Sequence, residues 1–139
     1  MKNSSDFKTD LEYGERAEQI FDGYFRNGSF EFKRDRHMHE TGRVFIEYQS
    51  RGKKSGIALD DVEPVWLYLT DDTSFGFVMD SARLIEALRV FRYECQQGFH
   101  KPPVAIDKRG GDNDTSIGAL IPVQDLVRIM LSLSKPTNA

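Results

Sequence analysis

The chain has 139 residues, of which 39% are hydrophobic and 29% are charged, and its formal net charge is −3. This length predicts a single domain over 1–139, with flexible polar ends at 1–8 and 134–139. No apolar run approaches the roughly 20 residues of a membrane-spanning helix, and the N-terminus lacks the apolar core of a signal peptide. The single cysteine excludes an intramolecular disulfide. Together these features predict a cytoplasmic protein.

The first predicted element is a helix over 10–21. Asp10 is a suitable N-cap. Leu11, Ala17, Ile20 and Phe21 fall on one face of such a helix, and the acidic residues between them lie largely off that face.

A short hairpin is predicted next, because the pair Asn27-Gly28 is a strong turn signal. After this turn, aromatic residues alternate with Glu31 and Lys33. On a strand the two charged residues therefore share one face. Asp22 lies before the turn, from where its carboxylate can approach the same face.

Apolar runs and turn signals define the rest of the chain. We predict strands at 44–49, 65–70, 74–80 and 119–123, and polar loops at 35–42, 50–57 and 107–116. A second helix starts at Asp80 or Ser81, carries an apolar stripe ending at Cys95 and stops before Gly98. A third helix follows Pro122. The predicted fold class is α/β (α+β), a sandwich with a mixed sheet.

Basic residues are concentrated between residues 31 and 54. This stretch has seven basic and four acidic side chains, a net charge of +3, whereas the rest of the chain has a net charge of −6. Such a stretch is typical of a phosphate-facing surface, and also of a solvated loop with mixed charges. The residues considered for contact with a nucleic-acid backbone are Arg34, Arg36, His37, His39, Arg43, Arg51, Lys53 and Lys54.

Asp22, Glu31 and Lys33 have the side chains needed for phosphodiester hydrolysis. Two neighbouring carboxylates repel each other unless a cation lies between them. Mg²⁺ takes oxygen ligands and keeps several waters, and a nearby ammonium can orient a water or stabilise charge on a phosphate. The alternative interpretation of the same spacing is a surface strand with a Glu/Lys ion pair.

Three further residues are assigned roles from the sequence. Asp35 has two possible roles, and the other two residues have a structural role. Asp35 shares the strand face of Glu31 and Lys33, where it can bind metal or anchor the basic side chains. Trp66, within the run VWLYL, and Cys95, on the second helix, are predicted to be core residues.

The segment FDGYFRNGSFEFK resembles the catalytic hairpin of the PD-(D/E)xK superfamily, which includes restriction endonucleases, junction resolvases and phage exonucleases. Phe21 stands where the proline of that pattern would be. The longer segment FEFKRDRHMHETGRVFIEYQSRGKKSGIA, with the later GGDNDTSIGALIP, is similar to small phage and prophage proteins of this superfamily. The resemblance covers about two thirds of the chain. It implies a restriction-endonuclease-like mixed β-sheet core flanked by helices.

The resemblance also implies roles for single residues. Glu31 and Asp22 would hold Mg²⁺ or Mn²⁺, Lys33 would assist the attacking water, and the helix before the hairpin would add Glu15 or Glu18 to the metal site. Two positions depart from the pattern, because Arg43 replaces an expected asparagine and Lys54 an expected proline.

A second register of the same pattern is also open. Some restriction enzymes have glutamine in place of the lysine, and Glu47 with Gln49 forms such a Glu-x-Gln pair on the next strand. Glu31 would then supply the first acid and Glu47 the second.

The function implied is a metal-dependent endonuclease that hydrolyses DNA, including branched or junction DNA. The resemblance further implies a homodimer in the cytoplasm of a bacterial host. The alternative is a protein of the same fold whose site has decayed and which binds DNA or a host protein. The acidic isoelectric point of about 5.6 favours this alternative.

Overall fold

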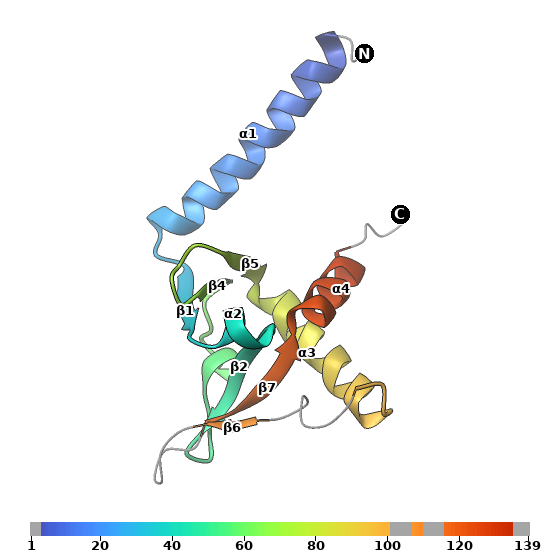
Figure 1. Cartoon of the computed structure of the whole chain (residues 1–139). Helices are drawn as coiled ribbons and strands as arrows, with labels where there is room; N and C mark the ends of the chain where they lie inside the picture. The colour runs from blue at the N-terminus through green and yellow to red at the C-terminus, as the bar shows by residue number, and fades with distance from the viewer. Residues whose placement is uncertain (1–3, 101–106, 110–115, 135–139) are drawn as a thin grey trace. The chain divides into compact units, whose positions relative to one another are not determined.

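The computed structural model describes residues 4–100, 107–109 and 116–134 (Figure 1). The chain divides into two compact units, Met1–Phe30 and Glu31–Ala139. The prediction of a single domain stays a prediction, and the two units are considered one at a time. None of the helices described is long and apolar enough to cross a membrane.

The first unit is built on one long helix, α1 (Ser4–Arg26), which begins well before the predicted start at Asp10. The helix is terminated by Gly28, two residues beyond its last residue, which adopts the left-handed conformation with φ of 65°. The backbone N–H of Ser29 donates to the carbonyl of Tyr24 at 3.0 Å, and that of Gly28 donates to the carbonyl of Phe25 at 3.3 Å. These two bonds form a Schellman motif. The predicted hairpin is therefore wrong, because here the Asn-Gly pair terminates a helix.

The apolar face of α1 is largely exposed. Leu11 is 51% exposed and Ile20 is 54% exposed. Near the end of the helix, aromatic rings pack on Phe30, with centroids 4.2 Å away for Phe25 and 5.6 Å away for Phe21. Tertiary packing within this unit is therefore concentrated around its last turn.

The second unit contains two sheets. The first has the order β1-β4-β5, with strands β1 (Phe30–Asp35), β4 (Val65–Thr70) and β5 (Gly76–Asp80). The second has the order β3-β2-β7-β6, with strands β2 (Arg43–Ser50), β3 (Lys53–Lys54), β6 (Asp107–Arg109) and β7 (Ser116–Pro122). All neighbours in the second sheet are antiparallel.

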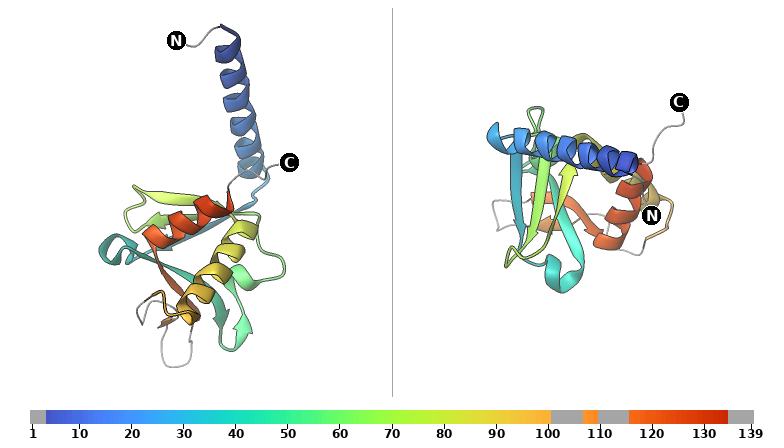
Figure 2. Two further views of the ribbon diagram at one scale, coloured as in Figure 1. Left: turned by 90° about the vertical axis from the view of Figure 1, so that its right-hand side faces the viewer. Right: turned by 90° about the horizontal axis from the view of Figure 1, so that it is seen from above.

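Helices α3 (Ser81–Gln96) and α4 (Val123–Leu133) pack against each other on one side of these strands (Figures 1 and 2). The predicted cap of α3 is confirmed, since the carboxylate of Asp80 accepts a hydrogen bond from the backbone N–H of Arg83 at 2.9 Å. The predicted stop at Gly98 is confirmed by its φ of 81°. The largest fully buried side chains of this core are Phe91, Ile46, Leu84, Ile121, Leu126 and Val44.

The predicted fold class is confirmed as a mixture of helices and small sheets. All three predicted loops are more ordered than expected. The segment 107–116 begins with strand β6 and ends at the start of β7, and its residues 110–115 lie outside the described structure. The segment 35–42 contains a single helical turn, α2 (Met38–Thr41), with Met38 buried. The segment 50–57 contains a tight β2–β3 hairpin and the 3-10 turn η1 (Gly56–Ala58). The two hairpin residues, Arg51 and Gly52, both have positive φ, as a type I′ turn requires.

A charged cluster joins α3 to α4. The guanidinium of Arg128 donates to both oxygens of Glu94, at 2.6 and 3.1 Å, and His100 Nε2 lies 2.9 Å from the same carboxylate. Arg128 also contacts Asp125 at 3.2 Å. The hydrogen bond from Arg128, followed by that from His100, holds the pKa of Glu94 below its ordinary value of 4.5, against the opposing effect of burial.

We expect Arg128→Met to lower the free energy of unfolding by about 1–2 kcal/mol near neutral pH, after discounting for the half-exposed guanidinium. Glu94 has a depressed pKa in the folded state. The stabilisation that ionised Glu94 contributes is therefore present when the pH is above its pKa in the unfolded chain. This stabilisation is lost as the pH falls below that pKa. Urea unfolding at about pH 7 and about pH 3 checks this, because the difference between wild type and variant should shrink at the lower pH.

Arg89→Met is the matched control, since the ion pair of Arg89 with Glu86 is exposed on one helix. It should change stability by less than about 0.5 kcal/mol at either pH. An equal loss for Arg128→Met at both pH values would contradict the role given to Glu94.

Candidate functional site

Strand β1 turns its charged face toward the interior of the second unit. Glu31, Lys33 and Asp35 are half-buried, whereas Phe32, on the opposite face, is 56% exposed. A strand that only packs would bury its aromatic residue and expose its charges. The sharing of one face by Glu31 and Lys33 is confirmed, and its inward orientation makes it a candidate site.

The lysine of this face is held in a defined place. Lys33 Nζ lies 2.9 Å from Glu31 Oε1 and 5.4 Å from the centroid of the Trp66 ring. Trp66 and Tyr68, both on β4, have nearly parallel rings with centroids 6.0 Å apart. The ammonium thus has an acid on one side and an aromatic surface on the other.

Three carboxylates act on the hydroxyl of Tyr68. Burial first, and then the charges of Asp35, Glu47 and Glu31, raise the pKa of Tyr68 far above its usual range. The hydroxyl therefore stays protonated at neutral pH and can donate a hydrogen bond. Glu47, on β2, and the two acids of β1 therefore act on the same hydroxyl, and we call these three carboxylates one electrostatic cluster.

Two backbone features position Glu47. The β2–β7 register shifts between Glu47, opposite Gly118, and Gln49, opposite Ile117, which makes a β-bulge. A bulge breaks the alternation of side chains that would otherwise place Gln49 on the face of Glu47. Gly56 passes so close to the Glu47 carbonyl that a Cβ would collide with it, and its φ is 54°. The close approach and the positive φ explain why position 56 is a glycine.

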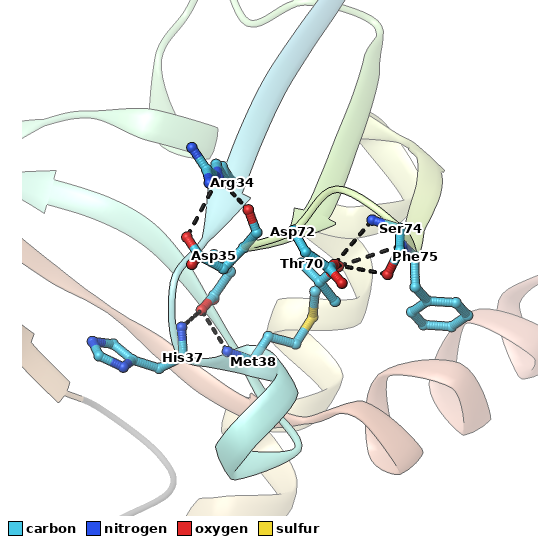
Figure 3. Close-up of polar contacts among 9 residues, drawn as sticks. Arg34, Asp35, His37, Met38, Thr70, Asp72, Ser74 and Phe75 are labelled. Atoms are coloured by element: carbon cyan, nitrogen blue, oxygen red, sulfur yellow. Dashed lines mark hydrogen bonds and ion pairs between the residues drawn. The ribbon is translucent and has the colours of Figure 1, made fainter.

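Asp35 has a structural role that neither sequence interpretation foresaw. One of its oxygens accepts backbone N–H groups from His37 at 3.0 Å and Met38 at 2.9 Å (Figure 3). The other accepts the backbone N–H of Phe45 at 3.0 Å. Asp35 therefore ties the end of β1 to both α2 and β2, and its oxygens are committed to the backbone.

Most of these residues, but not Glu31, line a pocket of about 360 Å³. Its lining combines four basic or imidazole side chains, two acids and three aromatic rings, namely Lys33, Arg34, Arg36, His37, Asp35, Glu47, Phe45, Trp66 and Tyr68. Apart from the imidazole, the lining has three positive and two negative charges. Its surface suits an anion that can approach between basic side chains.

Other predicted basic residues lie on several elements. Arg34 is anchored, because its Nε donates to the backbone carbonyl of Asp71 at 2.6 Å and lies 3.4 Å from the carboxylate of the same residue (Figure 3). The remaining residues are His39 on α2, Arg43 at the start of β2, and Arg51, Lys53 and Lys54 in the β2–β3 hairpin. Apart from the half-buried Arg43, this last group is exposed.

Asp22 and Glu15 lie on α1, in the first unit. The carboxylate of Asp22 pairs with Arg26 one turn later, at 2.7 Å, and both acids are exposed. Asp22 therefore sits on a helix and not at the end of a strand. Its role and that of Glu15 as metal ligands stay predictions.

The sequence analysis missed the aromatic wall of the pocket. Trp66 is buried as predicted, at 2% exposure, but it also lines the pocket with Tyr68. A signal for this was present in β4, where Trp66, Tyr68 and Thr70 alternate and place three polar-tipped side chains on one face.

Within the described part of the chain, no group of three His, Cys, Asp or Glu side chains is arranged to hold a metal ion. Mg²⁺ is commonly bound by only one or two carboxylates, with waters and substrate phosphates as the other ligands. Asp35 is committed to the backbone, which leaves Glu31 and Glu47 as the other two carboxylates that act on Tyr68.

The chain matches no model of a known protein family, no curated protein sequence and no solved structure.

Proposed function

We propose that this protein is a metal-dependent endonuclease that hydrolyses phosphodiester bonds in DNA, built on a restriction-endonuclease-like core. The observation that carries the proposal is the inward-facing Glu31-x-Lys33 pair of β1, which lies in one electrostatic cluster with Glu47 of β2. An acid-x-lysine pair whose lysine lines a pocket with other basic side chains has the chemistry that phosphodiester hydrolysis needs.

In this proposal, Glu31 and Glu47 hold Mg²⁺ or Mn²⁺, which supplies charge stabilisation for the reacting phosphate when bound. Lys33 orients the attacking water and stabilises negative charge on the phosphate oxygens. Glu31 also keeps the ammonium in place through their 2.9 Å contact. Tyr68 remains a neutral hydroxyl.

The DNA backbone would follow the basic residues beyond the pocket. The β2–β3 hairpin offers Arg51, Lys53 and Lys54, and α2 offers His39. Each phosphate contact adds to the salt dependence of binding. The proposal includes a homodimer, which can cut both strands. It also includes a phage or prophage origin for the protein and action in the cytoplasm of the bacterial host.

The test is a cleavage assay on linear duplex, single-stranded and four-way-junction DNA with Mg²⁺ or Mn²⁺, comparing wild type with Glu31→Ala. We expect metal-dependent cutting by the wild type that is lost in the variant. The substrate cut fastest identifies the preferred DNA structure. Wild-type protein that cuts no substrate with either metal would refute the proposed activity.

A second candidate is a binding protein with a decayed nuclease site. The direct ion pair of Glu31 with Lys33 favours it, because each group neutralises the other without any metal. This candidate predicts salt-dependent DNA binding without cleavage, and metal binding by the wild type no tighter than that of Glu31→Gln. Isothermal titration with Mn²⁺ separates the two candidates.

A further inference from the structure

The second unit has another pocket, of about 480 Å³, beside the turn that joins β4 to β5. It shares no lining residue with the basic pocket around Lys33. Its lining combines two carboxylates with apolar side chains, among them Asp71, Asp72, Phe75 and Phe77. A pocket of this volume can hold a small organic ligand or one part of a larger one.

Asp72 presents a hydrogen-bond acceptor in a fixed place. Its Oδ1 accepts from the hydroxyls of Thr70 and Ser74, both at 2.7 Å, and from the backbone N–H of Ser74 at 3.0 Å (Figure 3). Among the described residues, none donates to Oδ2. The two bonds from Ser74, followed by that from Thr70, lower the pKa of Asp72 from its ordinary value of 3.8 to about 2. The carboxylate is therefore ionised at neutral pH, and Oδ2 can accept from a ligand.

An aromatic ring with much of its surface open lines the same pocket. Phe75 is 59% exposed, and its ring meets that of Phe77 edge-on, with centroids 5.4 Å apart. Covering an exposed phenylalanine with a planar apolar group is favourable, because apolar surface leaves water and the two rings can stack. The pocket thus offers both a stacking surface and an acceptor.

Arg34 connects the two pockets. It lines the basic pocket, while its Nε donates to the backbone carbonyl of Asp71 and lies 3.4 Å from the carboxylate of that residue. This ion pair offsets the charge of Asp71, which lines the second pocket with His39 and Asp72. A ligand that has an anionic part and a planar part with N–H donors can therefore occupy both pockets. A nucleotide, with its phosphate and its base, is such a ligand.

The chemistry of the second pocket selects among the parts of a nucleotide. Its carboxylates repel a phosphate, whereas a nucleobase stacks on aromatic side chains and forms hydrogen bonds along its edge. Guanine has two neighbouring donors on its Watson–Crick edge, N1–H and the N2 amino group. The single N3–H of thymine lies between two carbonyl oxygens, which a carboxylate repels. A cationic side chain would also satisfy Asp72, but the adjoining basic pocket would repel it.

We propose that the second pocket binds an unpaired guanine base of the DNA substrate, with the ring on Phe75 and a Watson–Crick donor on Oδ2 of Asp72. The inference rests on the proposed function, which brings a backbone phosphate to the adjoining basic pocket. It narrows the substrate to single-stranded or branched DNA with an exposed guanine, because base pairing hides this edge in an intact duplex.

The experiment compares short single-stranded oligothymidylate with the same oligonucleotide carrying one central guanine. Both are titrated into the full-length protein in EDTA, which prevents metal-dependent cleavage. Fluorescence anisotropy gives the affinities, and ¹H–¹⁵N spectra follow the backbone amides of Ser74 and Phe75. We expect the guanine to tighten binding about 10-fold and to shift both amides. Annealing a complementary strand should remove this gain.

Asp72→Asn tests the acceptor itself. Its Oδ1 can keep the bonds from Thr70 and Ser74, while an amide nitrogen, which only donates, replaces Oδ2. This variant should lose the preference for guanine. Asp60→Asn removes the same charge at a side chain that is 96% exposed, and it should keep the preference.

Phe75→Leu tests the stacking surface and should weaken binding of the guanine oligonucleotide about 5- to 10-fold. Thermal melting verifies that each variant is folded. If Asp72→Asn does not fold, the exposed Phe75 and the wild-type comparison still decide.

The outcomes separate this inference from the proposed function. Equal affinity of the wild type for the two oligonucleotides, or a guanine preference that survives in Asp72→Asn, would overturn the inference and leave the nuclease intact. Binding of paired guanine as tightly as unpaired guanine would also overturn it. A guanine preference lost in Asp72→Asn, with no cleavage of any substrate, would refute the nuclease and support base recognition by a binding protein.

Discussion

Replacing Lys33 by methionine is expected to lower kcat for the proposed metal-dependent DNA cleavage by about 10²–10³-fold, the effect typical of removing one preorganised stabilising donor. Methionine keeps most of the aliphatic stem against Trp66 but removes the ammonium that lies 2.9 Å from Glu31. Single-turnover rates at saturating protein measure the change. A melting temperature close to that of the wild type would show that the variant is folded and that the lower kcat reflects the missing ammonium.

Lys54→Met is the matched control for that result. Lys54 lies on β3, and among the described residues its ammonium makes a single, long ion pair, 3.7 Å from the surface carboxylate of Asp60. The substitution should raise KM and leave kcat unchanged. It should also reduce the slope of log affinity against log salt concentration by about the amount that one phosphate contact contributes. A drop in kcat of the same size in both variants would contradict the special role of Lys33.

Asp35→Ala is expected to lower the free energy of unfolding by about 3–4 kcal/mol, because charge-assisted hydrogen bonds contribute roughly 1.5–3 kcal/mol each and are not additive. Three backbone N–H groups, those of His37, Met38 and Phe45, lose their acceptor. Asp35→Asn keeps one acceptor oxygen and should lose about half as much. Urea denaturation followed by circular dichroism measures both variants.

Asp60→Ala is the control for that series, because the side chain of Asp60 is 96% exposed. It should change stability by less than about 0.5 kcal/mol. If Asp35→Asn left stability intact but abolished Mn²⁺ binding, Asp35 would be a metal ligand, and its role as an anchor of the backbone would be refuted.

Elements whose signals are local were predicted well. Strand β4 has the predicted bounds, 65–70, because its aromatic and aliphatic residues favour strands and Asp71-Asp72-Thr73 provides a turn. The cap at Asp80 fixes the start of α3. The pair Asn27-Gly28 misled because its preference for positive φ serves a hairpin and a helix terminus equally. The choice depends on how the preceding residues pack, which a dipeptide does not encode.

The candidate site shows the same division. Two-residue periodicity sufficed to place Glu31 and Lys33 on one face of β1. The aromatic wall comes from β4, and Glu47 comes from β2 through a bulge. Their meeting with β1 depends on strand pairings between distant parts of the chain. No local signal specifies those pairings, and so Trp66 was predicted to be an ordinary core residue.

The long-range pairing of β2 with β7 affects how the protein is made. Ile46 lies opposite Ala119 in this ladder, so contacts join segments far apart along the chain. Such topologies fold slowly, since a long loop must close before the contacts form. During synthesis, a nascent chain that ends before residue 116 already carries Lys33, Glu47 and Trp66 but lacks the strand that holds β2 in register. We therefore expect the pocket to assemble only after β7 has emerged from the ribosome.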